Sequence, residues 1–195
     1  LNTEILERED YKEYLKDEYG ITDISKLQER RTIELGHIFQ LGTRYSSMMN
    51  GSYINKDGAS MPYYMGCYGI GVSRTVAAIY EASVIKYENE VKGIVLPKEV
   101  APYKLQIIPK VENEEKLKEA EELYNKLIKQ GINVIIDDRQ NITMGAKMKD
   151  CKVLGTPFMA VLGDKVENGY VEFEDIKTGK KEVIKAEELI GRVKI

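Results

Sequence analysis

The chain has 195 residues, of which 43% are apolar and 31% are charged, and its formal net charge is −3. This composition is typical of a globular protein with a hydrophobic core, and the length allows one large domain or two small ones. No stretch approaches the roughly 18 uninterrupted apolar residues of a membrane-spanning helix, so we expect no insertion into a membrane.

The first third of the chain predicts a helix followed by short antiparallel strands. Residues 3–19 have a patchy apolar side that indicates a charged helix, and the N-terminus has neither the basic start nor the apolar core of a signal peptide. Residues 33–41 have the composition of a strand. Turn signals at residues 50–51 and 56–58 separate further β-prone runs, which predicts a small antiparallel meander.

The segment GCYGIGVSR, residues 66–74, leads from this meander into an apolar stretch. We expect Ser73 to cap a helix that ends near residues 80–83. The segment lacks the small sixth residue of a Rossmann turn and the GK[ST] sequence of a Walker loop. Glycines still let a backbone approach a ligand, and an arginine at a helix start suits a phosphate or a base. The residues alone support equally a nucleotide site and a tight packing joint with Arg74 at the surface.

The second half of the chain follows a different pattern. Three of the five prolines lie within residues 97–109, which predicts a domain boundary near residue 97. Beyond it, β-prone runs alternate with runs of helical periodicity, which predicts an α/β domain. The expected strands are 104–108, 132–138, 157–163, 170–175 and 181–184, and the expected helices are 114–130, 146–155 and one at the C-terminus.

Cysteine and histidine are scarce in this chain. The two cysteines, Cys67 and Cys151, lie far apart, and His37 is the single histidine. This set excludes a clustered zinc site and provides no disulfide framework. We therefore expect a protein of the reducing cytoplasm without bound zinc or another metal centre.

Charge is distributed unevenly along the chain. Residues 1–31 carry nine acidic and six basic side chains, which accounts for the whole negative excess. Residues 139–152 hold four basic side chains and one acidic side chain, a pattern that is by itself typical of a solvated helix face. Because carboxylates can accept hydrogen bonds from guanine and lysines can hold phosphates, this region also indicates RNA binding. The candidate RNA-binding residues are Asp137, Asp138, Arg139, Lys147, Lys149 and Lys152.

Several segments, in a fixed order, resemble class II prolyl-tRNA synthetases of the bacterial type. Residues 66–74 resemble the third signature motif of that family, and GHIFQLGTRYS, residues 36–46, resembles the strand before it. The resemblance extends from about residue 33 to the C-terminus. Its anticodon-binding part rests on APY at 101–103, DDR at 137–139, LGTP at 154–157 and VLGD at 161–164.

The resemblance implies a fold of the α/β and α+β classes. Residues 1–96 would be the trailing part of the class II antiparallel-sheet catalytic core, with residues 1–31 helical and otherwise unassigned. Residues 97–195 would form a mixed-sheet α/β anticodon-binding domain. The first two signature motifs and the editing domain of the family have no counterpart here, and the chain lacks an initiator methionine. We therefore expect a C-terminal piece of a longer enzyme that is inactive in aminoacylation by itself.

The resemblance also implies a reaction, its substrates and its site. The family activates proline with ATP and Mg²⁺ and transfers it to proline tRNA, as a homodimer, and positioning and charge neutralisation supply the catalysis. Arg74 matches the catalytic arginine that contacts the adenine and the triphosphate. The expected ATP and adenylate contacts are Gly69, Gly71, Arg74, Gln40 and Thr43; the expected proline pocket is His37, Gly66 and Cys67; and the expected anticodon contacts are the six candidate RNA-binding residues.

One position departs from the family pattern, and two other functions stay open. Many relatives have a glutamate where this chain has Lys152, so base reading is altered here or has moved to another residue. The alternatives to the enzyme are a freestanding tRNA-binding or regulatory paralogue without catalysis, and a nucleotide-binding accessory subunit without an RNA role. An open reading frame that continues upstream through the other motifs would favour the enzyme.

Overall fold

The computed structural model describes residues 3–194, apart from the side chain of Tyr87. Contacts between residues divide the chain after Gly71 into a first unit, residues 1–71, and a second unit, residues 72–195. The proline-rich segment lies inside the second unit, and the domain boundary expected near residue 97 stays a prediction.

The helix expected over residues 3–19 is divided into two pieces. A 3-10 helix, Thr3–Glu7, precedes α1, Tyr11–Tyr19, and a second 3-10 helix follows at Ile24–Lys26. Between the two pieces, Arg8 Nε and Nη2 each donate to a carboxylate oxygen of Asp10 at 2.8 Å.

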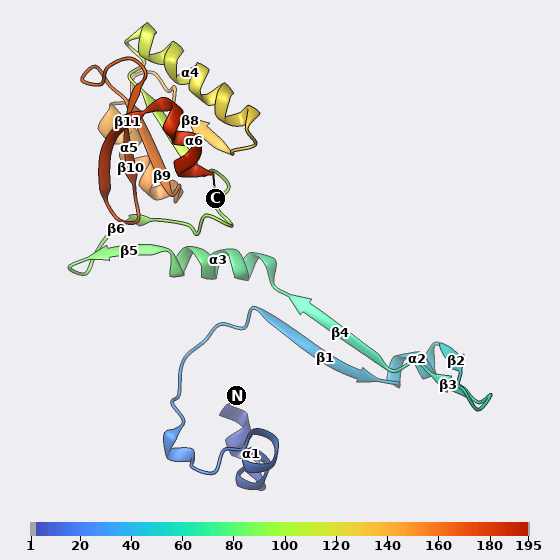
Figure 1. The fold of residues 1–195 in the computed structure, drawn as a ribbon. Helices are drawn as coiled ribbons and strands as arrows, with labels where there is room; N and C mark the ends of the chain where they lie inside the picture. The colour runs from blue at the N-terminus through green and yellow to red at the C-terminus, as the bar shows by residue number, and fades with distance from the viewer. Residues whose placement is uncertain (1–2, 195) are drawn as a thin grey trace. The chain divides into compact units, whose positions relative to one another are not determined.

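The strands of the first unit pair as two nested hairpins rather than as the meander that the sequence predicts. The elements are β1 Gly36–Gly42, α2 Arg44–Met48, β2 Ser52–Ile54, β3 Ser60–Pro62 and β4 Met65–Ile70. Strand β2 pairs with β3, and β1 pairs with β4, both antiparallel (Figure 1). The inner hairpin closes early because the Asn55 side chain accepts hydrogen bonds from the backbone of Asp57 and Ala59. The Ser46 hydroxyl donates to Tyr63 O at 2.6 Å, which returns the chain to β1.

The second unit begins with α3, Val72–Ala82, and a hairpin that the sequence analysis missed. Because α3 begins at Val72, Ser73 lies inside its first turn and does not cap it. The hairpin consists of β5, Val84–Tyr87, and β6, Glu90–Ile94. Its two turn residues, Glu88 and Asn89, both have positive φ, a conformation that favours asparagine in two-residue hairpin loops.

A five-stranded mixed sheet forms the centre of the second unit. Its strand order is β11-β10-β9-β7-β8, in which β7 is parallel to β8 and β9 while β10 is antiparallel to β9 and β11. The expected fold class, with a mixed α/β sheet in the C-terminal part, is therefore confirmed. The strands are β7 Leu105–Pro109, β8 Val134–Ile136, β9 Phe158–Leu162, β10 Tyr170–Asp175 and β11 Lys180–Lys185; the helices are α4 Glu114–Lys129, α5 Met144–Leu154, a 3-10 turn at Ala186–Glu188 and α6 Leu189–Val193.

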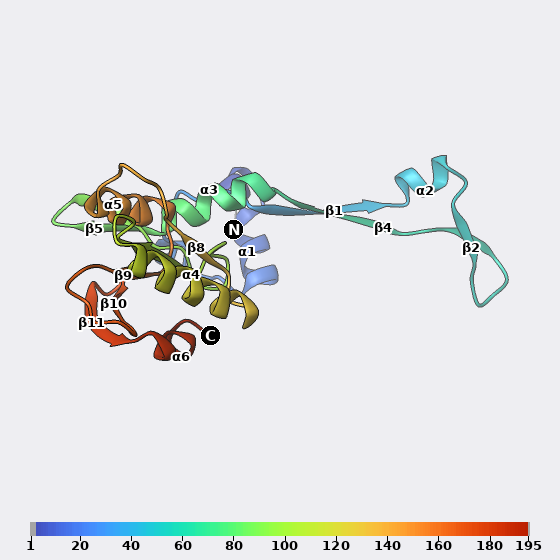
Figure 2. The same cartoon turned by 90° about the horizontal axis from the view of Figure 1, so that it is seen from above.

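The two faces of this sheet carry separate hydrophobic clusters. Helices α4 and α6 cover one face, where Leu123, Phe173 and Leu189 belong to the larger cluster. Helix α5 covers the other face, where Cys151 packs against Ile108 and Met159 (Figures 1 and 2). The alternation of strand side chains between the faces explains the two clusters, because successive residues of a strand point in opposite directions.

The segment that follows β6 is held against the end of α5. Leu96 N donates to Gly155 O at 2.9 Å, and the Leu96 side chain is buried. Gly155 ends α5 with φ +84°, and a Cβ at this position would lie 3.0 Å from Leu96 Cγ. Glycine is thus required here both by the left-handed backbone and by the close approach of Leu96.

Substitution of Gly155 separates these two requirements. Gly155→Ala should lower the free energy of unfolding by roughly 2–4 kcal/mol, because left-handed strain and overpacking add. Gly131→Ala is the matched control, since Gly131 has φ +74° and a Cβ added there would meet nothing within 4 Å, and it should cost only about 1–2 kcal/mol. Urea denaturation followed by circular dichroism measures both; equal losses would show that the contact with Leu96 contributes nothing.

Candidate functional site

The residues expected to bind ATP and proline face one another across the β1–β4 ladder. Gln40 lies opposite Gly66, and His37 lies opposite Gly69. The backbones approach closely at the end of the ladder, where a Cβ on Gly36 would lie 2.9 Å from Gly69 O. The structure therefore brings together residues from two sequence segments that the sequence analysis assigned to one site.

Both faces of this ladder are largely exposed. Ile38, Tyr68 and Ile70 expose 69%, 76% and 76% of their surface. Cys67, expected in the proline pocket, is also exposed. Contiguous exposed apolar side chains of this size mark a surface that is made for contact with other groups.

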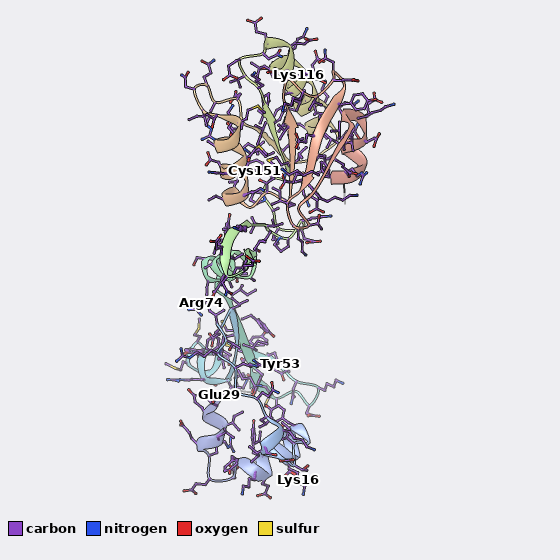
Figure 3. All side chains as sticks on the ribbon, turned by 90° about the vertical axis from the view of Figure 1, so that its left-hand side faces the viewer. Lys16, Glu29, Tyr53, Arg74, Lys116 and Cys151 are labelled. Atoms are coloured by element: carbon purple, nitrogen blue, oxygen red, sulfur yellow. The ribbon has the colours of Figure 1, made fainter. Side chains whose placement is uncertain are left out.

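Thr43 and Arg74 lie outside the β1–β4 ladder, Thr43 directly after β1 and Arg74 within α3. Thr43 follows β1, and its carbonyl oxygen accepts a hydrogen bond from Ser46 Oγ at 3.1 Å. Arg74 is exposed in the first turn of α3 and belongs to the second unit (Figure 3). Between them in the chain, Gly71 N donates to Leu35 O, which extends the ladder by one hydrogen bond.

In the second unit, three of the candidate RNA-binding residues follow β8, and two charged side chains of this region join into a cluster with α5. Arg139 Nε and Nη2 donate to the two oxygens of Asp137 at 2.8 and 2.7 Å. The same Nη2 also donates to Asp150 Oδ2 on α5 at 2.7 Å. The hydrogen bonds from Arg139 lower the pKa of the buried Asp137 carboxyl, against the opposing effect of burial. The guanidinium is therefore fixed in one plane by two carboxylates.

The lysines of the candidate surface differ sharply in their environment. Lys147 is only 1% exposed, and its Nζ donates to Asp137 O at 3.0 Å. This buried hydrogen bond holds the backbone directly after β8. Lys149 and Asp138 are exposed, and neither has a hydrogen bond or ion pair with any residue in 3–194. The burial of Lys147 argues against a direct phosphate contact, whereas Lys149 and Asp138 can reach a ligand.

Lys152 is the counter-ion of a buried carboxylate that the sequence analysis missed. Its Nζ lies 2.9 Å from Glu174 Oε1, and Lys181 Nζ lies 3.3 Å from Glu174 Oε2. Glu174 is 3% exposed on β10. The alternation of β10 would have revealed it, because Val171 and Phe173 face α4 and α6, so Glu174 must face α5.

A surface pocket of about 510 Å³ lies beside this cluster. It combines residues from α3, β7, the end of β8 and α5, which are distant in the sequence. Three of its side chains, Tyr80, Gln106 and Asp150, carried no signal in the sequence analysis. The lining residues are Tyr80, Gln106, Ile135, Ile136, Asp137, Asp138, Arg139, Asp150, Val153 and Leu154.

The remaining features concern metals, membranes and the second cysteine. Within residues 3–194 no group of three or more His, Cys, Asp and Glu side chains is placed to hold a metal ion. Over the same residues no helix has the length and apolar character needed to cross a bilayer. Burial raises the pKa of the Cys151 thiol to about 12, so this cysteine is a packing residue rather than a nucleophile (Figure 3).

Two family models match the chain, one in each half. The tRNA synthetase class II core domain (G, H, P, S and T) matches residues 10–83. The anticodon binding domain matches residues 104–194. The two matches follow one another in the order that the resemblance of the sequence motifs predicts.

Similar proteins carry the same name in bacteria. Proline–tRNA ligase of Aliarcobacter butzleri is 46% identical over 169 residues, which cover 86% of this chain and 29% of the relative. Proline–tRNA ligase of Desulfitobacterium hafniense is 42% identical over 171 residues, which cover 87% and 29%. The chain thus spans less than a third of the length of these relatives.

Solved structures of the same kind are similar in fold. The prolyl-tRNA synthetase of Cryptosporidium parvum, complexed with L-proline and AMP, matches with a TM-score of 0.69 and 27% identity, over 82% of this chain and 32% of that chain. The enzyme of Giardia lamblia, in complex with prolyl-adenylate, matches with a TM-score of 0.64 and 29% identity, over 80% and 32%.

Asp137 and Asp150 form an ionic clamp around Arg139. This clamp predicts a pH-dependent contribution to the free energy of unfolding. Because the folded state lowers the pKa of Asp137 below its ordinary 3.8, its carboxylate stabilises the fold above that pH, and the contribution is lost as the pH falls through the folded value. Asp137→Asn should therefore lower the free energy of unfolding by roughly 2 kcal/mol at pH 7. The difference between the variant and the unaltered chain should shrink below pH 3.8.

The matched control for this measurement is Asp138→Asn, which removes the neighbouring carboxylate without breaking an ion pair or hydrogen bond of residues 3–194. It should change the free energy of unfolding by less than about 0.5 kcal/mol at any pH. Urea titrations from pH 3 to pH 7 measure the free energy of unfolding of both variants and of the unaltered chain. A deficit for Asp137→Asn that stays constant over this range would contradict the clamp.

Proposed function

We propose that this chain, which belongs to the prolyl-tRNA synthetase family of class II aminoacyl-tRNA synthetases, is the C-terminal part of a proline–tRNA ligase. The observation that carries the proposal is the ordered match to a class II core over residues 10–83 and an anticodon-binding domain over residues 104–194, with bacterial proline–tRNA ligases 42–46% identical. The complete enzyme activates proline with ATP and transfers it to proline tRNA.

In that enzyme, residues 1–96 form the trailing part of the catalytic core and residues 97–195 form the anticodon-binding domain. ATP enters as its Mg²⁺ complex, and no zinc is needed. The enzyme works as a homodimer in the cytoplasm. The solved relatives support the choice of ligands, because they are complexed with L-proline and AMP or with prolyl-adenylate.

At the nucleotide site, we assign different roles to Arg74 of α3 and to the residues of β1 and β4. Attack of the proline carboxylate on the α-phosphate forms prolyl-adenylate and releases pyrophosphate, and the terminal adenosine of the tRNA then displaces AMP. Arg74 places a planar cation against the adenine and the triphosphate and neutralises charge that develops there. Gly69 and Gly71 let the ligand approach the backbone, Gln40 and Thr43 give polar contacts, and His37, Gly66 and Cys67 line the proline pocket.

The second unit reads the anticodon of proline tRNA. Asp138 accepts hydrogen bonds from a base, and Lys149 binds a phosphate, since both are exposed and lack a partner among the described residues. The role of Asp137, Arg139 and Lys147 is indirect: they hold the chain after β8, and so position Asp138 for contact with the RNA. A freestanding RNA-binding paralogue is not favoured, because the chain keeps a match to the catalytic core.

The enzymatic role can be tested in a chimaera. The matching C-terminal segment of the Aliarcobacter butzleri ligase is replaced by this chain, and proline-dependent exchange of pyrophosphate into ATP is measured. The chimaera should be active, the 195-residue chain alone should give no exchange above background, and Arg74→Ala should lower kcat/KM for ATP by about one to two decades.

Two controls sharpen this experiment. Arg74→Lys should restore activity only in part, because an ammonium cannot stack as a plane. Arg192→Ala removes an arginine that pairs with Glu182 on the anticodon-binding domain, and it should leave the ATP kinetics unchanged. A folded chimaera without exchange would contradict the enzymatic role, and normal ATP kinetics of Arg74→Ala would make Arg74 a surface residue.

The different environments of the two lysines on α5 predict different effects on RNA binding. Lys149→Ala should weaken binding of the chain to every anticodon stem-loop and reduce the slope of log K against log salt by about 0.7. Lys147→Met keeps the length of the buried side chain and should lower the free energy of unfolding without changing that slope. Anisotropy titrations at several salt concentrations measure both; a reduced slope for Lys147→Met alone would reverse the assignment.

A further inference from the structure

The segment between the two family matches is folded against helix α5. The class II core match ends at residue 83 and the anticodon-domain match begins at residue 104, so the β5–β6 hairpin belongs to neither. Its strand β6 approaches the last turn of α5 so closely that a Cβ on Gly93 would lie 3.0 Å from both Lys152 Cβ and Lys152 O. Only a glycine allows this separation without displacing one of the two backbones.

The two residues that follow β6 continue this contact with α5. Leu96 N donates to Gly155 O at 2.9 Å, and the buried Leu96 side chain lies directly over that glycine. Val95 packs against the hydrophobic cluster that contains Cys151 of α5. The segment is therefore held to α5 by its backbone and by its side chains, and is not a free linker.

The same segment also holds the C-terminal end of α3. Val95 N donates to Ser83 O at 2.9 Å, and Ser83 Oγ donates to Ile79 O in the last turn of α3 at 2.6 Å. A two-stranded hairpin is at best marginally stable by itself, so the β5–β6 hairpin depends on α5 for its order. The hairpin thus attaches α3, the helix that carries Arg74, to the five-stranded sheet and its helices.

The ion pair beneath Gly93 decides which partner moves when this contact is disturbed. Lys152 Nζ pairs with the buried Glu174 carboxylate at 2.9 Å. Displacement of Lys152 by a side chain at position 93 would leave that carboxylate with Lys181 alone, at 3.3 Å. Because a buried charge that loses its partner is strongly destabilising, α5 stays in place and the hairpin moves instead.

We propose that the β5–β6 hairpin positions the second unit for the transfer of proline to tRNA, with Gly93 and Leu96 as the positioning residues. The inference rests on the proposed function. Activation of proline involves only small ligands at the nucleotide site. Transfer requires one tRNA to bring its terminal adenosine to that site while its anticodon is bound at the second unit, so the separation of the two sites must be set. A misplacement of about 1 Å can lower a rate roughly 100-fold.

Hydrogen exchange of the 195-residue chain tests the contact itself. Gly93→Ala and Leu96→Ala should each lower the protection of the amide at position 96 by about tenfold or more, while the amides of β7 keep their protection. Neither variant should change the affinity for an anticodon stem-loop that carries UGG. Val91→Ala, at an exposed position of the same strand, is the matched control and should alter neither quantity. Unchanged protection in both variants would show that these residues do not hold the hairpin.

The chimaera with the Aliarcobacter butzleri ligase tests the role in transfer. In Gly93→Ala and Leu96→Ala, kcat for aminoacylation of proline tRNA should fall by roughly 10- to 100-fold at unchanged KM for the tRNA. Proline-dependent exchange of pyrophosphate into ATP should stay at the level of the unaltered chimaera. Residues that only stabilise the fold would lower the two activities together.

Two results would overturn the inference and leave the proposed function standing, because the unaltered chimaera is active in both. One is normal aminoacylation by a variant whose amide at position 96 has lost its protection. The other is a parallel loss of exchange and aminoacylation, which would place the effect at the nucleotide site. An unaltered chimaera without exchange contradicts the proposed function itself, and the inference fails with it.

Discussion

The second unit depends on the ionic clamp in which Asp137 and Asp150 hold Arg139. The clamp joins the end of β8 to α5, and Lys147 secures it from beneath through Asp137 O. A buried carboxylate such as Asp137 is tolerated only when it is paired and hydrogen-bonded. The neutralisation of Asp137 therefore orients the guanidinium and adds a polar link from β8 to α5, which the cluster around Cys151 packs against the sheet.

A second buried carboxylate, Glu174, is neutralised in the same way on the other side of α5. Lys152 reaches it at 2.9 Å, and the β6 residue Gly93 lies so close to Lys152 that a Cβ there would be 3.0 Å from Lys152 Cβ. With the contact between Leu96 and Gly155, these interactions attach the β5–β6 hairpin to α5. Position 152 thus carries a lysine that pairs with a carboxylate of the sheet, Glu174 on β10.

The first unit differs from the second, because few of its own residues cover the side chains of the β1–β4 ladder. Side chains such as Ile38 and Ile70 project from a two-stranded hairpin, and such a hairpin is at best marginally stable by itself. This exposure agrees with a chain that spans 29% of its bacterial relatives. Strand register brings Gln40 opposite Gly66 and His37 opposite Gly69 within this ladder.

The likeness to prolyl-tRNA synthetases, the mixed α/β class and most elements of the second unit could be predicted from the sequence alone. Its signals were local: the helical spacing of Ala120, Leu123 and Leu127, the glycine that ends α5, and motifs in a fixed order. The folded chain was needed to establish the pairing of β1 with β4, the burial of Lys147 and the ion pair of Lys152 with Glu174. These depend on contacts between residues far apart in the chain, and a lysine has the same local signature whether its ammonium meets solvent or a buried oxygen.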